Sequence, residues 1–219
     1  EDSYLKLKNA TTNFGAATDI ILDRESTDKH VGVVKFDFTA LTCYATLVRS
    51  ATLKMYRISG TDQVVSAYRL MKNWTESQVT WNNRLTGTAW TTAGGDYNGA
   101  DLIDATGTPV ANIYNWNATN IIHNMVCSTA LYPNYGFIVR VDATGGNRLT
   151  TFASRENTPA GVIKPSLLVT FDSAAFICAP IPVRPPMAMP DTIATNSNAS
   201  VLINPITNDQ LPGLHNGTV

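Results

Sequence analysis

The sequence predicts an all-β protein: a jelly-roll-like β-sandwich over residues 1–178 with one short helix. Apolar and polar residues alternate with a period of two along several short segments, which is typical of strands with one buried face. Turn-forming Gly, Asn and Asp residues separate these segments. Charged residues make up only 15% of the chain, and Thr, Asn, Ser and Gly supply the remaining polarity. This composition is common in secreted β proteins.

Strands with one buried face are predicted where every second residue is apolar. These segments are Leu5–Lys8, Ala51–Tyr56, Phe137–Asp142 and Leu167–Asp172. Two denser apolar runs, Asp19–Leu22 and Val31–Phe38, favour central strands that are covered on both sides. Turns are expected at five glycine-containing stretches: Asn13–Gly15, Ser59–Asp62, Gly94–Gly95, Asn98–Gly99 and Thr144–Asn147.

One stretch departs from this alternation. Within Thr119–Cys127, Ile121, Ile122 and Met125 recur at helical spacing. We therefore expect a short helix there, with Thr119 or Asn120 as its N-cap. Such a helix would cover an open end of the sandwich.

The composition changes after Cys178. Residues 179–190 contain five prolines and predict a stiff, extended linker without a core of its own. Residues 191–219 resemble the opening strands of a bacterial immunoglobulin-like or cadherin-like repeat, which needs roughly 100 residues to close. Either the parent protein continues beyond Val219, or the strand Ser200–Ile206 completes the sheet of a neighbour.

Charge and hydropathy exclude two classes of partner. The net charge is −1 and no basic cluster is present, which argues against nucleic acid. No apolar run approaches the roughly 18 residues of a membrane helix, so membrane insertion is not expected. Cys43, Cys127 and Cys178 show no zinc-binding spacing. Two of them could pair in an oxidising compartment, or all three could be buried thiols, and both interpretations stay open.

Seven blocks in a fixed order resemble the DNRLRE-domain family, which includes the family 96 carbohydrate-binding modules. They are Tyr4–Leu7 with Asn13–Gly15, Val33–Asp37, Ser50–Tyr56, Ala67–Leu70 with Trp74–Asn83, Asn134–Phe137, Phe152–Glu156 and Pro165–Leu167. The resemblance implies an extracellular, all-β, non-catalytic module. The Gly- and Asn-rich segment from Trp90 to Trp116 matches the family pattern poorly, so a family-specific binding loop is not implied there.

Aromatic rings are the first candidates for a binding site, because the apolar face of a pyranose stacks on an exposed ring. Trp74 and Trp81 lie in blocks shared with the family and are interpreted as core residues. Four rings of the divergent segment are candidate ligand-binding residues, with burial as the alternative interpretation: Trp90, Trp116, Tyr97 and Tyr114.

Calcium is a candidate cofactor, because four side chains with oxygen ligands lie close together in the sequence: Asp96, Asn98, Asp101 and Asp104. Calcium takes about six to eight oxygens, but the EF-hand spacing is missing, so a solvated polar loop is the alternative. A site built from the terminal strands would combine Asp2 with Asp172. Glu76 and Glu156 lie in family blocks, and we interpret them as structural partners of an arginine, with three candidates: Arg69, Arg140 and Arg155.

No catalytic motif is present: the chain lacks Gly-x-Ser-x-Gly, HExxH and a Gly-rich phosphate loop. The family resemblance and the modular layout imply a non-catalytic, extracellular module of a large bacterial surface or adhesive protein. Its expected partners are polysaccharides or cell-surface glycans, and neighbouring repeats or subunits of the same protein. Two alternatives remain. One is a structural subunit or spacer of an extracellular fibre that donates its C-terminal strand, and the other is an ancillary domain of a secreted polysaccharide-degrading enzyme.

Overall fold

The computed structural model describes residues 1–37, 47–106, 109–142, 149–158 and 161–172. Contacts between Cα atoms divide the chain into two units, Glu1–Ile177 and Cys178–Val219. The predicted linker, the predicted repeat, Cys43 and Cys178 lie outside the described residues, so the predictions about the repeat and the disulfide stay predictions. No helix in the described part is long and apolar enough to cross a membrane.

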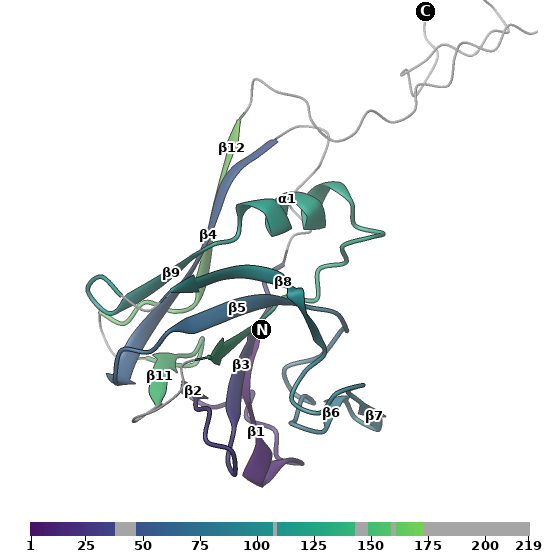
Figure 1. The fold of residues 1–219 in the computed structure, drawn as a ribbon, viewed down its shortest axis with the longest axis vertical. Coiled ribbons are helices and arrows are strands. Elements are labelled where there is room, and N and C mark those ends of the chain that lie inside the picture. The colour runs from purple at the N-terminus through teal and green to yellow at the C-terminus, as the bar shows by residue number, and fades with distance from the viewer. Residues whose placement is uncertain (38–46, 107–108, 143–148, 159–160, 173–219) are drawn as a thin grey trace, which may run out of the picture. The chain divides into compact units, whose positions relative to one another are not determined.

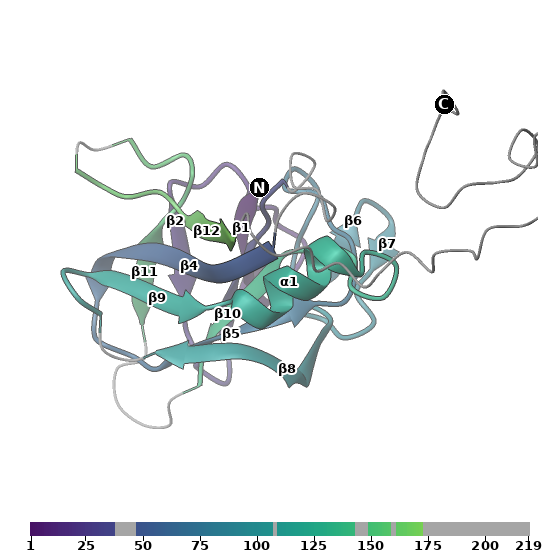
Figure 2. The same ribbon diagram turned by 90° about the horizontal axis from the view of Figure 1, so that it is seen from above.

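Two antiparallel sheets form the first unit (Figures 1 and 2). The first sheet contains, in spatial order, β1 (Asp2–Lys6), β3 (His30–Val34), β10 (Phe137–Val141), β5 (Val65–Leu70) and β8 (Tyr97–Thr106). The second contains β12 (Ser166–Asp172), β4 (Leu47–Gly60), β11 (Thr150–Ala153) and β2 (Asp19–Leu22), with β9 (Ile113–Asn117) also paired to β4. The smaller elements are a 3-10 turn (Leu7–Asn9), β6 (Asn83–Leu85), β7 (Thr88–Ala89) and α1 (Thr119–Cys127).

The path of the chain between the sheets is that of a jelly roll. β1, β3 and β5 lie in the first sheet, and β2 and β4, which alternate with them along the chain, lie in the second. Later, β9 and β10 again fall in different sheets. Crossing between sheets in this way places sequence-distant strands side by side, as in β10 between β3 and β5. The predicted all-β sandwich with one short helix is confirmed.

The main core lies between the two sheets and follows from the alternation in the sequence. On β4, Ala51, Leu53 and Met55 are buried, whereas the residues between them face outward. Phe137, Val139 and Val141 of β10 meet this core from the opposite sheet. These inward-facing positions are the ones that the period-two pattern predicts.

A second core covers the outer face of the first sheet. It contains Leu5, Val33 and Ile138 from the strands, and Trp74, Trp81 and Trp90 with Val79 from the segment that follows β5. The strands β1, β3 and β10 are therefore covered on both faces, and every residue of β3 is buried, whereas β8 of the same sheet is largely exposed. The prediction of a doubly covered strand over Val31–Phe38 is confirmed for Val31–Val34, where β3 ends, and is wrong for Lys35–Asp37, which lie outside the strand and are partly or fully exposed. Phe38 lies outside the described residues.

The same prediction is wrong for Asp19–Leu22. β2 lies at the edge of the second sheet and pairs only with β11. Its burial alternates, with Ile20 and Leu22 buried and Asp19 and Ile21 only partly buried. An apolar run of four residues does not distinguish an edge strand from a central one, because strand order is a tertiary property.

The helix α1 has the predicted bounds, Thr119–Cys127. Its buried residues Ile122, Met125 and Val126 belong to the main core. The predicted N-cap is wrong, because the N-cap position is Ala118. The hydroxyl of Thr119 instead accepts the N–H of Ala51 on β4 at 3.0 Å, and so fastens the start of the helix to the second sheet.

Candidate functional site

Two of the candidate sugar-binding rings, Tyr114 and Trp116, lie in the main core. Both are fully buried, and the Trp116 indole N–H donates to the carbonyl of Val65 at 2.8 Å. The Tyr114 hydroxyl donates to the carbonyl of Gln63 at 3.1 Å. Because β9 alternates, Asn115 and Asn117 face solvent in place of these rings. In this structure neither ring has a free face on which a sugar could stack.

Trp90 is also buried, at 4% exposure, in the second core. Its indole N–H donates to the carbonyl of Thr80 at 3.0 Å. Trp74 and Trp81 lie in the same core, as predicted. The divergent segment thus supplies a third indole that covers the first sheet, and this ring too has no open face for stacking.

Tyr97 is the one candidate ring that stays partly exposed. Its ring centroid lies 4.9 Å from that of Tyr68, and the Arg140 guanidinium lies 5.1 Å from the Tyr97 centroid. Arg140 also pairs with Asp142 at 3.1 Å, and the Tyr68 hydroxyl donates to the same carboxylate at 3.2 Å. Tyr97 is therefore part of a small cluster of rings and charges on the first sheet.

The four predicted calcium ligands are not brought together. The buried carboxylate of Asp96 accepts the N–H groups of Thr91 and Thr92 at 2.8 and 2.6 Å. The Asn98 side chain accepts the N–H of Ala100 at 3.0 Å, whereas Asp101 pairs with Arg69 at 2.7 Å. Asp96, Asn98 and Asp101 thus each bond a separate protein donor, and calcium binding by these residues stays a prediction.

β8 explains this separation, because it carries a large bulge. Tyr97 lies opposite Leu70 and Leu102 lies opposite Tyr68, so five steps along β8 face two along β5. The predicted turn at Asn98–Gly99 is therefore an insertion within a strand. The insertion spreads the oxygen-bearing side chains along the sheet edge instead of wrapping them around one point.

Residues of β8, β9 and α1 line an open groove. Figures 1 and 2 show how these three elements are arranged. Its first part has a volume of about 360 Å³ and is lined mainly by polar side chains: Asp101, Asp104, Asn117, Asn120, Asn124 and Tyr132. Its second part, of about 670 Å³, continues along the outer face of β4 and β9. The two parts share Asp104, Asn117 and Asn120, so they form one elongated depression.

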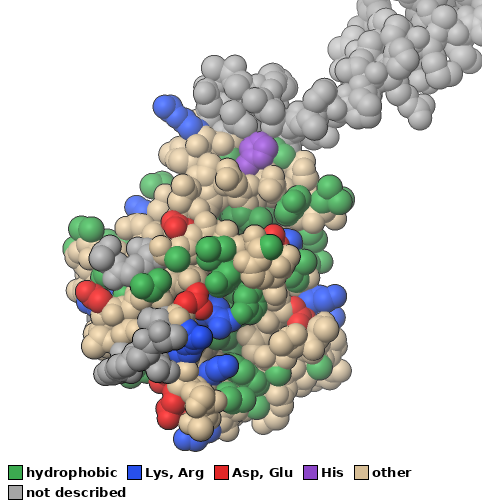
Figure 3. All heavy atoms as spheres, viewed as in Figure 1, with side chains coloured by type: hydrophobic (Ala, Val, Ile, Leu, Met, Phe, Trp, Pro, Cys, Tyr) green, Lys and Arg blue, Asp and Glu red, His purple; other side chains and the backbone are tan. Residues whose placement is uncertain are grey.

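The groove is held in shape by bonds between its walls. The Asp104 carboxylate accepts the backbone N–H of Asn117 at 2.8 Å and so joins β8 of the first sheet to β9 of the second. Arg69 forms a salt bridge with Asp101. The guanidinium of Arg69 also lies 5.1 Å from the centroid of the Tyr132 ring. Figure 3 shows hydrophobic side chains toward the middle of this side of the molecule, with a group of Lys, Arg, Asp and Glu side chains next to them.

Comparison with known families places the sequence. A family model described as carbohydrate-binding module family 96 matches residues 1–171. The chain belongs to this family. The predicted resemblance is thereby confirmed for the β-sandwich, and carbohydrate-binding families are generally non-catalytic. No curated protein matches the chain.

The groove of this family 96 module is suited to hydroxyl-rich ligands. Asn117 and Asn120 are exposed and Asn124 is partly exposed, and each amide both donates and accepts hydrogen bonds. Leu102, which is 48% exposed, adds an apolar surface on β8. In concave ligand sites, a few polar groups fix the orientation of the ligand beside apolar surface. The sequence did not identify this groove, because its walls come from two sheets and a helix.

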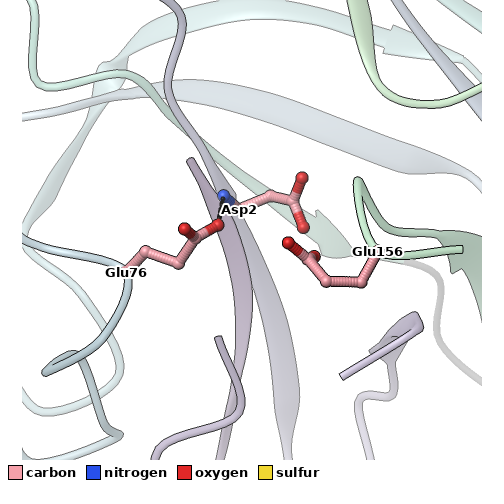
Figure 4. A group of neighbouring side chains, drawn as sticks. All are labelled: Asp2, Glu76 and Glu156. Atoms are coloured by element: carbon pink, nitrogen blue, oxygen red, sulfur yellow. Dashed lines mark hydrogen bonds between the residues drawn. The ribbon is translucent and has the colours of Figure 1, made fainter. Parts of the chain in front are cut away.

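The family 96 module also contains a group of three carboxylates, from Asp2, Glu76 and Glu156 (Figure 4). Arg155 bonds Glu76 at 2.7 Å and Glu156 at 2.9 Å, which confirms the prediction of a structural arginine partner for these two residues. Burial raises the pKa of Asp2 to about 6, although the N–H of Arg155 partly offsets this effect. Among the described residues, this is the group whose carboxylates could share an ion, and it contains Asp2 but not Asp172.

Proposed function

We propose that this family 96 module binds a neutral polysaccharide along the groove between β8, β9 and α1. The observation that carries the proposal is the elongated shape of the groove together with its amide and hydroxyl lining. An open, elongated depression can accommodate several sugar units of a long chain. The family match supports carbohydrate as the ligand class.

The charges around the groove favour a neutral chain over a polyanion. Asp101 is neutralised by Arg69, whereas Asp104 at the middle of the groove bonds only backbone N–H groups in the structure described. Arg49 lines the far end of the second part. A uronic acid placed over Asp104 would meet a carboxylate of like charge, which disfavours binding.

The ring of Tyr132 provides the stacking surface in this proposal. It is partly exposed, and Arg69 lies over it, which orients the ring at the end of the groove. Tyr97 lies at the start of β8 in the first sheet and remains a second candidate for contact with the ligand. Stacking on such a ring and hydrogen bonds to nearby amides would together orient the sugar.

Calorimetric titration of the 219-residue protein with soluble neutral and uronic acid polysaccharides tests the proposal. We expect saturable binding to a neutral polysaccharide and a roughly fivefold loss of affinity in Asn120→Ala, as for the loss of one hydrogen bond of about 1 kcal/mol. Asn82→Ala is the matched control, because Asn82 is an exposed amide that does not line the groove. No binding to any glycan, or equal affinities in both variants, would refute the groove as the site.

The wider setting is also a proposal: an extracellular module of a large bacterial surface or adhesive protein, next to further repeats. The low charge content and the five prolines of residues 179–190 support it. The alternative of a fibre subunit depends on Ser200–Ile206, which lies outside the described residues. Deleting residues 191–219 and measuring polymerisation by sedimentation separates the two, because only a donated strand makes assembly depend on this segment.

A further inference from the structure

We propose that Asp2, Glu76 and Glu156 together bind one divalent cation, with calcium as the expected ion. The three residues come from β1, from the segment between β5 and β6, and from the segment after β11. The site lies apart from the groove and shares no lining residue with it. It is therefore independent of the proposed sugar binding.

The spacing of the carboxylate oxygens fits a shared ion. One oxygen from each residue can be chosen so that all three lie within 4.8 Å of one another. Calcium–oxygen distances are about 2.3–2.6 Å, so two ligands on opposite sides of the ion are separated by roughly 5 Å. Figure 4 shows the side chains of Glu76 and Glu156 extending toward Asp2 from either side.

A second observation points to a missing ligand: two buried oxygens of this group have no hydrogen-bond partner. They are Oδ1 of Asp2 and Oε2 of Glu156. Asp2 as a whole is only 4% exposed. A buried carboxylate oxygen without a partner is unfavourable, and most buried polar atoms in folded proteins are satisfied. An ion between Asp2 and Glu156 would satisfy both oxygens at once.

The other oxygens are fixed by hydrogen bonds that orient the three carboxylates. The backbone N–H of Asp2 donates to Oε1 of Glu76 at 2.8 Å, and the N–H of Arg155 donates to Oδ2 of Asp2 at 3.0 Å. The guanidinium of Arg155 donates to Oε2 of Glu76 at 2.7 Å and to Oε1 of Glu156 at 2.9 Å. Asp2 and Glu156 thus each keep one oxygen free, whereas Glu76 would share an oxygen between the ion and its present donor.

Charge also favours a divalent ion. Three ionised carboxylates and the single guanidinium of Arg155 leave a net charge of −2, which one divalent cation balances. The Arg155 side chain is 55% exposed, so it can move toward solvent when the ion binds. The side chains of Glu76 and Glu156 are 15% and 24% exposed, which leaves room for water to complete the coordination.

The chemistry of the donor set selects a hard cation. The cluster offers carboxylate oxygens and contains no His or Cys, so zinc and other metals that prefer nitrogen or sulfur are disfavoured. Magnesium requires a smaller and nearly ideal octahedral site, whereas calcium tolerates irregular oxygen geometry. Calcium is therefore the expected ion among the two.

The test is calcium titration of the chelator-treated 219-residue protein, followed by calorimetry and by thermal unfolding without any glycan. We expect one ion per chain and a rise in Tm with calcium, because an ion that binds only the folded state stabilises it. In Asp2→Asn and Glu156→Gln the calcium affinity should fall at least tenfold and the rise in Tm should disappear. Asp2→Asn removes an unpaired buried charge, so this variant should fold without the ion.

Glu25→Gln is the matched control, because Glu25 is an exposed acid outside the cluster, and its calcium response should equal that of the unmodified protein. Two results would overturn the proposal. No heat and no change in Tm at millimolar calcium would show that a proton, not a metal, satisfies the cluster. Calcium binding that is unchanged in both cluster variants would place the ion elsewhere.

Discussion

At the scale of single residues, strand parity decides which rings of β9 are available to a ligand. Tyr114 and Trp116 alternate with Asn115 and Asn117, and only the amides reach solvent. This alternation is visible in the sequence and could have predicted the burial of both rings. Trp90 lacks such a signal, because it lies in an irregular segment whose packing on the first sheet is a tertiary contact.

His30 gives a residue-scale prediction about pH. Burial lowers its pKa from 6.5, although the charge of Asp28 partly opposes this, and Lys6 and Asp23 also act on the ring. The unfolded chain therefore binds the proton at a higher pH than the folded chain, so stability is lost as the pH falls below about 6.5. The contribution of His30 to the free energy of unfolding should therefore decrease from pH 7 to pH 5, whereas the raised pKa of Asp2 acts in the opposite direction.

His30→Gln is the corresponding variant, because its side chain stays uncharged over this range. The free energy of unfolding, measured with denaturant in both proteins, should respond less unfavourably to acidification from pH 7 to pH 5 in His30→Gln than in the unmodified protein. An unchanged pH dependence in the variant would show that other groups are responsible.

The three-carboxylate cluster shows where residue-level prediction ends. A bond to an arginine could be expected for both glutamates from the sequence. Glu156 directly follows Arg155, and Glu76 lies seven residues after Arg69. Their meeting with Asp2 could not be expected, because Asp2 and Glu76 are 74 positions apart. Only the crossing of the chain between sheets brings these segments together.

At the scale of elements, the turn Asn13–Gly15 fixes the segment that carries Glu76. The Asn13 amide donates to the carbonyls of Glu76 and Val79, each at 2.7 Å. A Cβ on Gly15 would lie 2.3 Å from the carbonyl oxygen of Glu76, which is too close for a real contact. The glycine is therefore required by packing at this position.

We predict that Gly15→Ala lowers the free energy of unfolding by about 1–3 kcal/mol, because backbone must move to accept the added methyl. Gly99→Ala is the control, since its Cβ would have no heavy atom within 4 Å, and its effect should stay within about 0.5 kcal/mol. Denaturant unfolding of both variants measures the difference. Equal effects would show that the contact of Gly15 with Glu76 can relax freely.

Elements with a strong period were predictable, and elements shaped by their neighbours were not. The bounds of α1 and the inward face of β4 follow from spacing alone. The edge position of β2 depends on strand order, and the bulge in β8 depends on its pairing with β5. Local sequence carries the period of an element but not its place in a sheet.

At the scale of the whole molecule, the sequence predicted the sandwich but not its third layer. The segment with Trp74, Trp81 and Trp90 packs on the outer face of the first sheet. The side chains of this segment therefore cover the outer face of β1, β3 and β10. The open groove lies instead where the two sheets and α1 meet, so the candidate site could be found only after the strands were placed.

The net charge of −1 leads to a whole-molecule prediction about salt. Binding of a neutral polysaccharide through hydrogen bonds and stacking involves no long-range attraction, so added salt has little to screen. The measured Kd should change by less than about twofold between about 50 mM and about 500 mM NaCl. A steep loss of affinity over this range would instead indicate an anionic glycan and electrostatic attraction.

The two-sided burial of β3 has a consequence for how this domain can diverge. All five residues of β3 are buried, so no position on that strand is free to change without altering a core. On β4, by contrast, Lys54 and Tyr56 face outward, do not line the groove and are constrained by one face only. We therefore expect sequence drift among related modules to concentrate on the part of the outer face of the second sheet that lies outside the groove. Surface redesign, such as attaching a label or a new recognition patch, is best directed to that part of the face.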